Sequence, residues 1–369
     1  MNVDWYFKLH WMDRMLAAQD AGYKVCIISN FSSDNIRLEL TEAGVDVYDI
    51  NLSRTTVNPF QELLTVVKLN KLIEQIDPLL IHGITAKPNA YAGIVAKIND
   101  IPIVCSVTGL GVVFSRRNIK NLILKKITMF IYHFVSKNPN SIFLFENSSD
   151  RKLLVDHGVI PSIAAKKISG AGVDIEMYYY SLEQAASRPS ILFAARLLRD
   201  KGLLTLVDAI QIVRDKGMDV ELKVAGILDN DAQNSISEEE VVQLEKTGSI
   251  TWLGKRNDIP QLIRSSSLVC LPTTYGEGIP RVLIESAACG RAIITTNVSG
   301  CNEFVIDGFN GLVVEPNNTI ELSKAIEKLL LNPGLRNTFG KNGRLLVEKS
   351  YTKEIVIDQT LAAYSGVVN

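Results

Sequence analysis

The stretch from residue 268 to residue 296 constrains the fold most, because it contains the patterns of a strand, a loop, a helix and a second strand in succession. LVCLPT is a short apolar run ended by Pro272, which is typical of a buried parallel strand. Pro280 then opens a helical pattern, and Gly290 stands where a C-terminal cap belongs. The next apolar run, RAIITT, predicts another strand, as expected for an open parallel sheet.

The same alternation runs through the first half of the chain. Apolar runs at 23–29, 45–50, 77–84 and 101–107 predict strands, and the segments between them, at 34–43, 59–76 and 88–98, have helical spacing after a first helix near 9–21. Such alternation predicts a doubly wound α/β sheet. A length of 369 residues allows two ordinary domains, and the polar segment SLEQAASRPS at 181–190 predicts the boundary near 180.

Charge and composition exclude several classes of protein. A net charge of −1 excludes a strong overall attraction to nucleic acid or anionic surfaces. Five cysteines without CxxC spacing and four isolated histidines give no pattern of a metal site, so we expect no metal and no other cofactor. The odd number of cysteines argues against a disulfide framework, and Cys26, Cys105 and Cys270, in apolar runs, are expected to be buried thiols in a reducing compartment.

The N-terminus does not have the pattern of a cleavable signal, because Asp4, Lys8, His10 and Asp13 stand where an apolar core would be required. No segment offers about 18 uninterrupted apolar residues, the minimum for a spanning helix. We therefore expect a cytoplasmic protein.

Two glutamates flank the start of the helix that follows Pro280. Glu277 lies in the loop before it, and Glu285 lies inside it. In an open parallel sheet, ligands bind beyond the carboxyl ends of the strands, where helix N-termini favour phosphate. Because a carboxylate repels a phosphate, acids at this place indicate a phosphate ligand that also carries hydroxyl groups, such as a sugar nucleotide. The alternative is that Glu277 complements the helix dipole and that Glu285 is a solvated helix residue.

The string EGIPRVLIE resembles the E-x7-E signature of the family-4 retaining nucleotide-sugar glycosyltransferases. ACG, TNVSGCNE and DGFNGLVVEP follow in the order and spacing typical of that family. The resemblance implies a GT-B fold, with two Rossmann-like domains whose parallel sheets face each other across a cleft. It implies that Glu277 faces the hydroxyl groups of the donor sugar and Glu285 those of the ribose. The rest of this loop is assigned to donor binding, namely Gly276, Gly278, Ile279 and Pro280.

The family also implies a domain plan. Residues 1–180 would bind the acceptor, residues 181–350 would bind the sugar nucleotide, and a helix at 351–369 would cross back to the N-terminal domain. Relatives usually begin with a strand before the segment that corresponds to NVDWYFKLHW, and this sequence begins almost directly there. Because the first strand of a Rossmann-like sheet is normally central, we expect either that the true start lies upstream or that another element covers the gap.

Two cations precede a helix at the start of the second half. In SILFAARLLRDKG, Arg196 and Lys201 follow an apolar strand and lie before a helix that begins around Leu203. Cations at a helix N-terminus oppose its dipole, so an anion is expected between them, although pairing with a nearby carboxylate is the alternative. The match to the family's RLxxxKG motif implies that both clamp the donor diphosphate, as catalytic groups beside Glu277.

Three more residues of the second half are assigned to the donor. Gly226 ends the predicted strand VELKVAG. The WLGKRND turn lies near the nucleotide base in this family, so Lys255 and Arg256 are expected base contacts. Solvated charges in a turn are the alternative.

The first half resembles the subgroup that acts on sugars attached to polyprenyl diphosphate, through AKPNAYAG, VTGLGVVF and FENSSDRKLL. Because glycine lets backbone amides approach a ligand, Thr108, Gly109 and Gly111 are expected to form part of a diphosphate-binding lip, with a tight turn as the alternative. Lys87 and Arg54 are expected to meet the acceptor phosphates as charge-assisted partners.

His82, at the end of a predicted strand, is assigned to the same acceptor site, with a hydrogen-bonded core histidine as the alternative. Relatives often carry a second polar or aromatic residue two places later, where this sequence has Ile84. That departure argues against acid–base work by this turn.

A basic segment without acidic residues lies between Asp100 and Glu146. NIKNLILKKITMFIYHFVSK places apolar residues on a broad helical face, at Ile119, Leu122, Ile123, Met129, Phe130 and Phe134. This pattern predicts an interfacial helix with its cations near anionic lipid. The alternative is an ordinary amphipathic helix with a solvated basic side. The residues assigned to the membrane are Arg116, Arg117, Lys120, Lys125 and Lys126.

Together with these observations, the resemblance implies a metal-independent retaining glycosyltransferase on the inner face of the plasma membrane. It would move a hexose or N-acetylhexosamine from a nucleotide diphosphate sugar, UDP-linked, to a polyprenyl-diphosphate-linked sugar in O-antigen, capsule or related glycan assembly. Two other classes stay open. One is a nucleotide-sugar epimerase of the same fold, and the other is a non-catalytic protein that binds sugar nucleotides.

Overall fold

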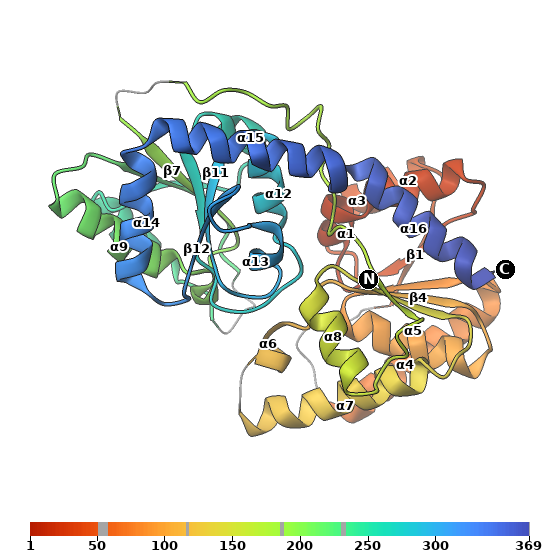
Figure 1. The fold of residues 1–369 in the computed structure, drawn as a ribbon. Helices are drawn as coiled ribbons and strands as arrows, with labels where there is room; N and C mark the ends of the chain where they lie inside the picture. Colours follow the sequence, from red (N-terminus) through yellow and green to blue (C-terminus); the bar gives the residue numbers. More distant parts are fainter. Residues whose placement is uncertain (51–57, 116–117, 185–187, 230–233, 369) are drawn as a thin grey trace. The chain divides into compact units, whose positions relative to one another are not determined.

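The computed structural model describes residues 1–50, 58–115, 118–184, 188–229 and 234–368 (Figure 1). They form two compact units, one of Met1–Ala171 with Lys353–Asn369 and one of Gly172–Thr352. The chain therefore divides at Ala171 rather than near residue 180, and the C-terminal helix α16 (Lys353–Val368) belongs to the first unit. Both units are built from parallel strands that alternate with helices, so the α/β prediction is confirmed.

The second unit contains one parallel sheet of six strands in the order β12-β11-β10-β7-β8-β9. In β10, one of the two central strands, Leu268 pairs with Ile191 of β7 on one side and with Ala292 of β11 on the other. All residues of this strand are buried, as expected where helices cover both faces of a parallel sheet. The strands are β7 (Ser190–Ala194), β8 (Glu221–Ala225), β9 (Thr251–Gly254), β10 (Leu268–Leu271), β11 (Ala292–Thr296) and β12 (Gly311–Val314).

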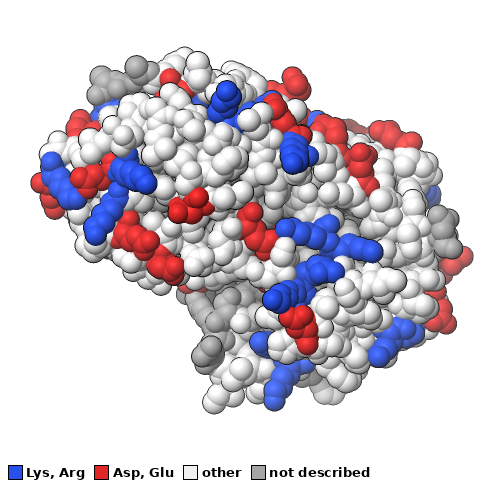
Figure 2. All heavy atoms as spheres, viewed as in Figure 1, with Lys and Arg blue, Asp and Glu red and all other residues white. Residues whose placement is uncertain are grey.

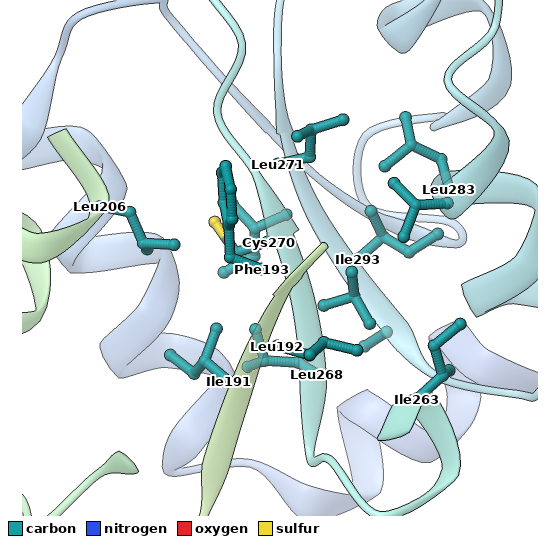
Figure 3. Close-up of a cluster of buried hydrophobic side chains, with 14 of the residues drawn as sticks. Ile191, Leu192, Phe193, Leu206, Ile263, Leu268, Cys270, Leu271, Leu283 and Ile293 are labelled. Atoms are coloured by element: carbon teal, nitrogen blue, oxygen red, sulfur yellow. The ribbon is translucent and has the colours of Figure 1, made fainter. Parts of the chain in front are cut away.

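The core of the second unit is formed by this sheet and its flanking helices. Figure 3 shows apolar side chains of β7, β10 and β11 between Leu206 of α9 and Leu283 of α12, which lie on opposite sides of the strands. Helix α9 packs against α14, and α12 packs against α15. The helices are the 3-10 turn η1 (Arg199–Lys201), α9 (Leu203–Asp215), α10 (Glu238–Lys246), α11 (Ile259–Arg264), α12 (Arg281–Ala288), α13 (Cys301–Phe304), α14 (Thr319–Leu330) and α15 (Pro333–Ser350).

The first unit contains two separate parallel sheets. One pairs β1 (Cys26–Ser29) with β2 (Asp46–Asp49). The other has the order β3-β4-β5-β6, from β3 (Ile81–Ile84), β4 (Ile103–Val107), β5 (Ser141–Phe145) and β6 (Ala165–Lys167). The helices are α1 (Asp4–His10), α2 (Met12–Asp20), α3 (Asp34–Glu42), α4 (Pro59–Ile76), α5 (Ala86–Ile98), α6 (Gly111–Ser115), α7 (Ile119–Val135) and α8 (Ser148–Asp156).

A cavity of about 640 Å³ lies in this unit, lined by residues of both β1 and β3. Ile27 of β1, Ile81 of β3 and Trp11 of α2 are among its lining residues. In the part of the chain that the structure describes, only α1 and α2 precede β1, and the two strands do not pair with each other. The cavity therefore lies along both β1 and β3, which belong to separate sheets.

Helices α4, α5 and α7 lie next to one another on one side of the first unit (Figure 1). Helix α5 packs against both α4 and α7. Asn58 caps α4 by accepting from the amide of Phe60, and Asn118 caps α7 by accepting from that of Asn121. None of the described helices combines the length and the apolar content that crossing a membrane would require.

The five cysteines are free thiols. Four of them are buried, and Cys26 is half-buried.

Candidate functional site

The loop between β10 and α12 contains Glu277 and packs against the loop after β11. The amide of Glu277 donates to the carbonyl of Ser299 at 3.2 Å. Gly300 has a φ of +84°, and a Cβ there would lie 2.4 Å from the carbonyl oxygen of Glu277 and 2.2 Å from that of Gly278. Only glycine therefore allows the two loops to approach this closely, and their contact fixes the backbone of Glu277.

Glu277 is paired with Lys201. The Lys201 Nζ donates to both carboxylate oxygens of Glu277 at 2.6 Å and lies 5.3 Å from the centre of the Tyr275 ring. Lys201 is 7% exposed. Burial is the largest single influence and lowers the pKa of Lys201, but the charges of Glu277 and Tyr275 and the hydrogen bond to Glu277 together raise it, so the pKa lies above its usual value. The structure thus brings together two of the three residues predicted to be catalytic.

Arg196, the third, lies near this pair. Its Nη1 donates to Asp229 Oδ2 at 2.7 Å, and its charge acts on both Lys201 and Tyr275. Arg196 and Lys201 therefore lie in one charged region at the carboxyl edge of the sheet, and each is paired with a carboxylate. Pairing of the two cations with nearby acids is observed, as the alternative interpretation expected. It does not replace the donor assignment, because an incoming diphosphate offers the same cations a second anionic partner.

Glu285 lies on α12 and is 7% exposed. Its carboxylate accepts from Arg281 Nε at 2.7 Å, one turn earlier on the same helix. Burial and then the charge of Glu285 raise the pKa of Tyr178, which shares a hydrogen bond with that carboxylate. The interpretation of Glu285 as a solvated helix residue is therefore wrong. Its carboxylate lies in a polar cluster at the start of α12.

The other loop residues assigned to donor binding shape the backbone. Pro280 directly precedes the first residue of α12, and Ile279 is buried. A Cβ at Gly276 would lie 3.0 Å from that of Ser299, while one at Gly226 would lie 2.2 Å from the carbonyl oxygen of Ala195. Gly226 thus lets the end of β8 approach the segment that leads to Arg196.

The WLGKRND turn forms an open hollow of about 490 Å³ in the second unit. Arg256 binds Asp258 through two hydrogen bonds of 2.8 and 2.6 Å. Among the described residues, those that line the hollow do not include the charged groups around Glu277, so the base assignment stays a prediction. The lining residues are Met177, Lys255, Arg256, Asn257, Asp258, Pro260 and Gln261.

In the first unit, His82 is half-buried, lines the cavity described above and is held by two hydrogen bonds. Its Nδ1 lies 2.7 Å from the Tyr364 hydroxyl and its Nε2 lies 2.8 Å from Ser106 Oγ. Burial, with smaller contributions from the charges of Arg14 and the N-terminus, lowers the pKa of His82 to about 3. Both ring nitrogens are engaged, which is the arrangement that the core-histidine alternative describes.

The remaining acceptor residues lie after the strands of this sheet. Lys87, at the start of α5, pairs with Glu62 of α4 at 2.9 Å. Thr108 and Gly109 follow β4, and Gly109 and Gly111 have φ values of +112° and +63°. This geometry suits both a tight turn and a loop whose amides approach a ligand. Arg54 lies outside the described residues.

The membrane assignment falls mainly on α7. Lys120 and Lys126 are exposed, and Lys125 Nζ lies 5.4 Å from the centre of the Phe114 ring. Arg116 and Arg117 lie outside the described residues. Most of the apolar residues predicted to form one face are exposed, whereas Asn121, Tyr132 and Val135 on the opposite side are buried. The apolar side of α7 therefore faces away from the core, which an ordinary amphipathic domain helix does not do.

Sequence reasoning missed Asp229, Tyr178 and Gly300. Asp229 follows the carboxyl end of β8, a position where a polar residue is a site candidate in any open parallel sheet. Tyr178 lies far from Glu285 in the sequence, so no local pattern points to their contact. In the described chain, no group of three or more His, Cys, Asp or Glu residues is arranged to hold a metal ion.

Comparisons with known proteins agree over most of the chain. Residues 181–346 match the family model described as glycosyl transferases group 1, and residues 1–144 match that of glycosyl transferase 4-like proteins. The chain is 26% identical over 348 residues to the N,N'-diacetylbacillosaminyl-diphospho-undecaprenol alpha-1,3-N-acetylgalactosaminyltransferase of Campylobacter jejuni, covering 91% of this chain and 89% of that protein. It is 27% identical over 335 residues to the capsular polysaccharide biosynthesis glycosyltransferase CapM of Staphylococcus aureus, covering 89% and 87%.

The fold has solved neighbours as well. The structure of Anabaena Alr3699/HepE in complex with UDP and glucose superimposes with a TM-score of 0.74 at 19% identity, covering 97% of this chain and 95% of that one. This likeness supports the GT-B fold expected from the sequence.

Proposed function

We propose that this chain is a retaining glycosyltransferase, since residues 181–346 match the model of glycosyl transferases group 1 and residues 1–144 match that of glycosyl transferase 4-like proteins. It moves a hexose or N-acetylhexosamine from a nucleotide diphosphate sugar to a polyprenyl-diphosphate-linked sugar. The observation that carries the proposal is the contact of Lys201 with Glu277, beside Arg196. It joins the cations that would meet a diphosphate to the carboxylate that would meet a sugar.

The donor side follows from these charges. When the bond between the sugar and the diphosphate breaks, negative charge develops on the departing phosphate. Fixed cations at that point stabilise the charge without reorganisation, and each such group contributes about 3–4 kcal/mol. Arg196 and Lys201 take this role, so no metal ion is required for it.

Retention is assigned to attack from the face that the diphosphate leaves. Glu277 is engaged with Lys201 and lies on a loop held by Gly300, which suits a residue that orients the sugar rather than one that attacks it. Glu285, with Arg281 and Tyr178 around its carboxylate, is assigned to the ribose hydroxyl groups.

Relatives support the acceptor and the nucleotide. The names of the Campylobacter jejuni relative and of an Escherichia coli relative that is 20% identical, UDP-Gal:alpha-D-GlcNAc-diphosphoundecaprenol alpha-1,3-galactosyltransferase, both contain an undecaprenyl-diphosphate-linked sugar. The second name and the Anabaena complex contain UDP. We assign a UDP-linked donor and a lipid-linked acceptor in O-antigen, capsule or related glycan assembly, at the inner face of the plasma membrane. The epimerase and the non-catalytic binding protein have no supporting observation.

The test is a donor panel. Purified protein is incubated with nucleotide sugars and a short-chain polyprenyl-diphosphate-linked sugar, and nucleotide release is measured with and without acceptor in the presence of a chelator. We expect acceptor-dependent release with one UDP-sugar and retention in the product.

Variants of the charged groups complete this test. Arg196→Ala should reduce donor cleavage by about 100-fold or more. Release that needs no acceptor would favour hydrolysis or isomerisation, and full turnover by Glu277→Gln would overturn the assignment of roles.

A further inference from the structure

The first turns of α4 expose an apolar stripe that the sequence analysis did not single out. Phe60 is 79% exposed and Leu63 is 61% exposed. Their spacing places the stripe on one side of the helix, opposite Leu69 and Ile73, which are buried. A helix on the surface of a soluble domain normally turns its polar side to water, whereas this half of α4 exposes an apolar side. The stripe consists of Phe60, Leu63, Leu64 and Val67.

Helix α7 exposes an apolar side in the same way. Ile119 is 78% exposed and Phe130 is 73% exposed, while Tyr132 and Val135 are buried against the core. The outward side therefore carries apolar residues over the whole length of the helix. Its exposed members are Ile119, Leu122, Ile123, Ile127, Phe130 and Phe134.

The two stripes belong to one layer of helices. Helix α5 packs against both α4 and α7, and its Ala90 and Ile94 are half-buried. In the strand order of this unit, α4 follows β2 and α7 follows β4, and both strands belong to parallel sheets. Helices that follow parallel strands start at the carboxyl edge of their own sheet, so Phe60 lies toward that edge of the β1-β2 sheet and Ile119 toward that edge of the β3-β4-β5-β6 sheet. We call the two stripes together the α4/α7 face.

The exposed charges beside this face are mainly positive, although Glu74 of α4 is an exposed acid. Lys68 and Lys71 on α4 are exposed, as are Lys120 and Lys126 on α7. Glu62, the acidic residue in the first turns of α4, is paired with Lys87 at 2.9 Å. The sequence between Asp100 and Glu146 contains no acid. The lower edge of the view in Figure 2, where Figure 1 places α7, accordingly shows mainly uncharged and positive side chains.

We propose that the α4/α7 face docks on the surface of an anionic lipid bilayer. Exposed apolar stripes beside lysines are the arrangement that places side chains between lipid headgroups and cations near their phosphates. The loop of Thr108 to Gly111 follows β4 at the same carboxyl edge as Ile119. Docking there would bring that loop to the bilayer, where a polyprenyl-linked acceptor resides. The proposal deepens the proposed function in this respect, but its observations are independent of any transfer reaction.

The experiment measures co-sedimentation of the full chain with vesicles, without donor or acceptor. We expect binding to vesicles that contain about a third anionic phospholipid, weak binding to neutral vesicles, and weaker binding at high salt. Phe60→Ser and Ile119→Ser should each lower the partition coefficient about tenfold. Ile163→Ser, a residue of the same unit that is 82% exposed but lies outside the face, is the matched control and should bind as the parent does.

Three outcomes would overturn the proposal. One is equal binding of the parent to neutral and anionic vesicles, or none to either. Another is loss of binding by Ile119→Ser but not by Phe60→Ser, which would remove α4 from the face. The third is a dimer of the parent in sedimentation velocity that Phe60→Ser dissociates, which would identify a second copy as the occupant.

The experiments can contradict the docking proposal and the proposed function independently of each other. A protein that binds vesicles but releases no nucleotide from any donor would retain the docking face and lose the proposed function. Turnover of a water-soluble, short-chain acceptor without vesicle binding would support the proposed function and contradict the docking face.

Discussion

Replacing Glu277 by Gln removes the charge that balances Lys201, whose Nζ lies 2.6 Å from both carboxylate oxygens. The two side chains are 9% and 20% exposed, so water screens the pair weakly. Removing one partner of a buried ion pair costs about 3–5 kcal/mol, because the other charge stays buried. Since Glu277 is partly exposed, we expect the low end, about 3 kcal/mol. In a unit of this size this lowers Tm by roughly 6–12 °C.

The double variant Lys201→Met/Glu277→Leu separates stability from function. Apolar residues of similar volume often replace a buried ion pair at no cost, so Tm should return close to that of the parent. Turnover should not return, since the cation and the carboxylate are both gone, and we expect a loss of about 100-fold or more. The two measurements are thermal unfolding and acceptor-dependent release of nucleotide.

A surface pair provides the control. Arg188 and Asp219 lie 2.8 Å apart in the same unit, and both are well exposed. Asp219→Asn should therefore change stability by less than about 1 kcal/mol. Turnover within tenfold of the parent in the apolar double variant would refute the catalytic role of the pair, and an unchanged Tm in Glu277→Gln would refute its burial energetics.

Two further variants test particular contacts. Gly300→Ala places a methyl group within 2.4 Å of two carbonyl oxygens, so the loop of Glu277 must shift and kcat should fall about 100-fold. The control is Gly308→Ala, at a similar φ with no neighbour within 4 Å. It should cost only about 1–2 kcal/mol of stability and keep turnover. Between pH 6.5 and about 3, His82 binds fewer protons in the folded than in the unfolded state, so the free energy of unfolding should fall as the pH drops below 6.5. Denaturant titrations of the parent should show this loss between pH 7.5 and pH 5. His82→Gln should remove about 2 kcal/mol of it. Equal pH dependence in both proteins would contradict the shifted pKa.

The sequence predicted those parts of the structure that local patterns encode. The helix expected at 59–76 is α4, because Pro59 and a regular apolar spacing mark it. The stretch from residue 268 to residue 296 folds as predicted, since it contains its own strands, loop, helix start signal and cap. The charged residues assigned to the donor could be singled out because they follow the ends of strands, where a parallel sheet gathers polar groups.

Other features depend on contacts between distant segments. The pairing of Arg196 with Asp229, and of Tyr178 with Glu285, requires strands and loops to meet, and no spacing rule encodes it. The outward apolar side of α7 agrees with the interfacial helix that the sequence predicted. The contact with the core was not predicted, because Tyr132 and Val135 supply it and no local pattern marks them. Which side of an amphipathic helix is buried is decided by the sheet it packs on.

The first unit should unfold before the second. Its strands form two separate sheets with a cavity of about 640 Å³ along β1 and β3, whereas the second unit has one continuous sheet of six strands. Missing contacts along a cavity lower stability. UDP at 100 times its Kd should stabilise the unit that binds it by about 2.7 kcal/mol and leave the other unchanged. Calorimetry should therefore show two transitions, of which UDP raises only the upper one, by roughly 5–11 °C. A shift of the lower transition would mean that the nucleotide binds elsewhere, and a single transition would mean that the cavity does not weaken the first unit.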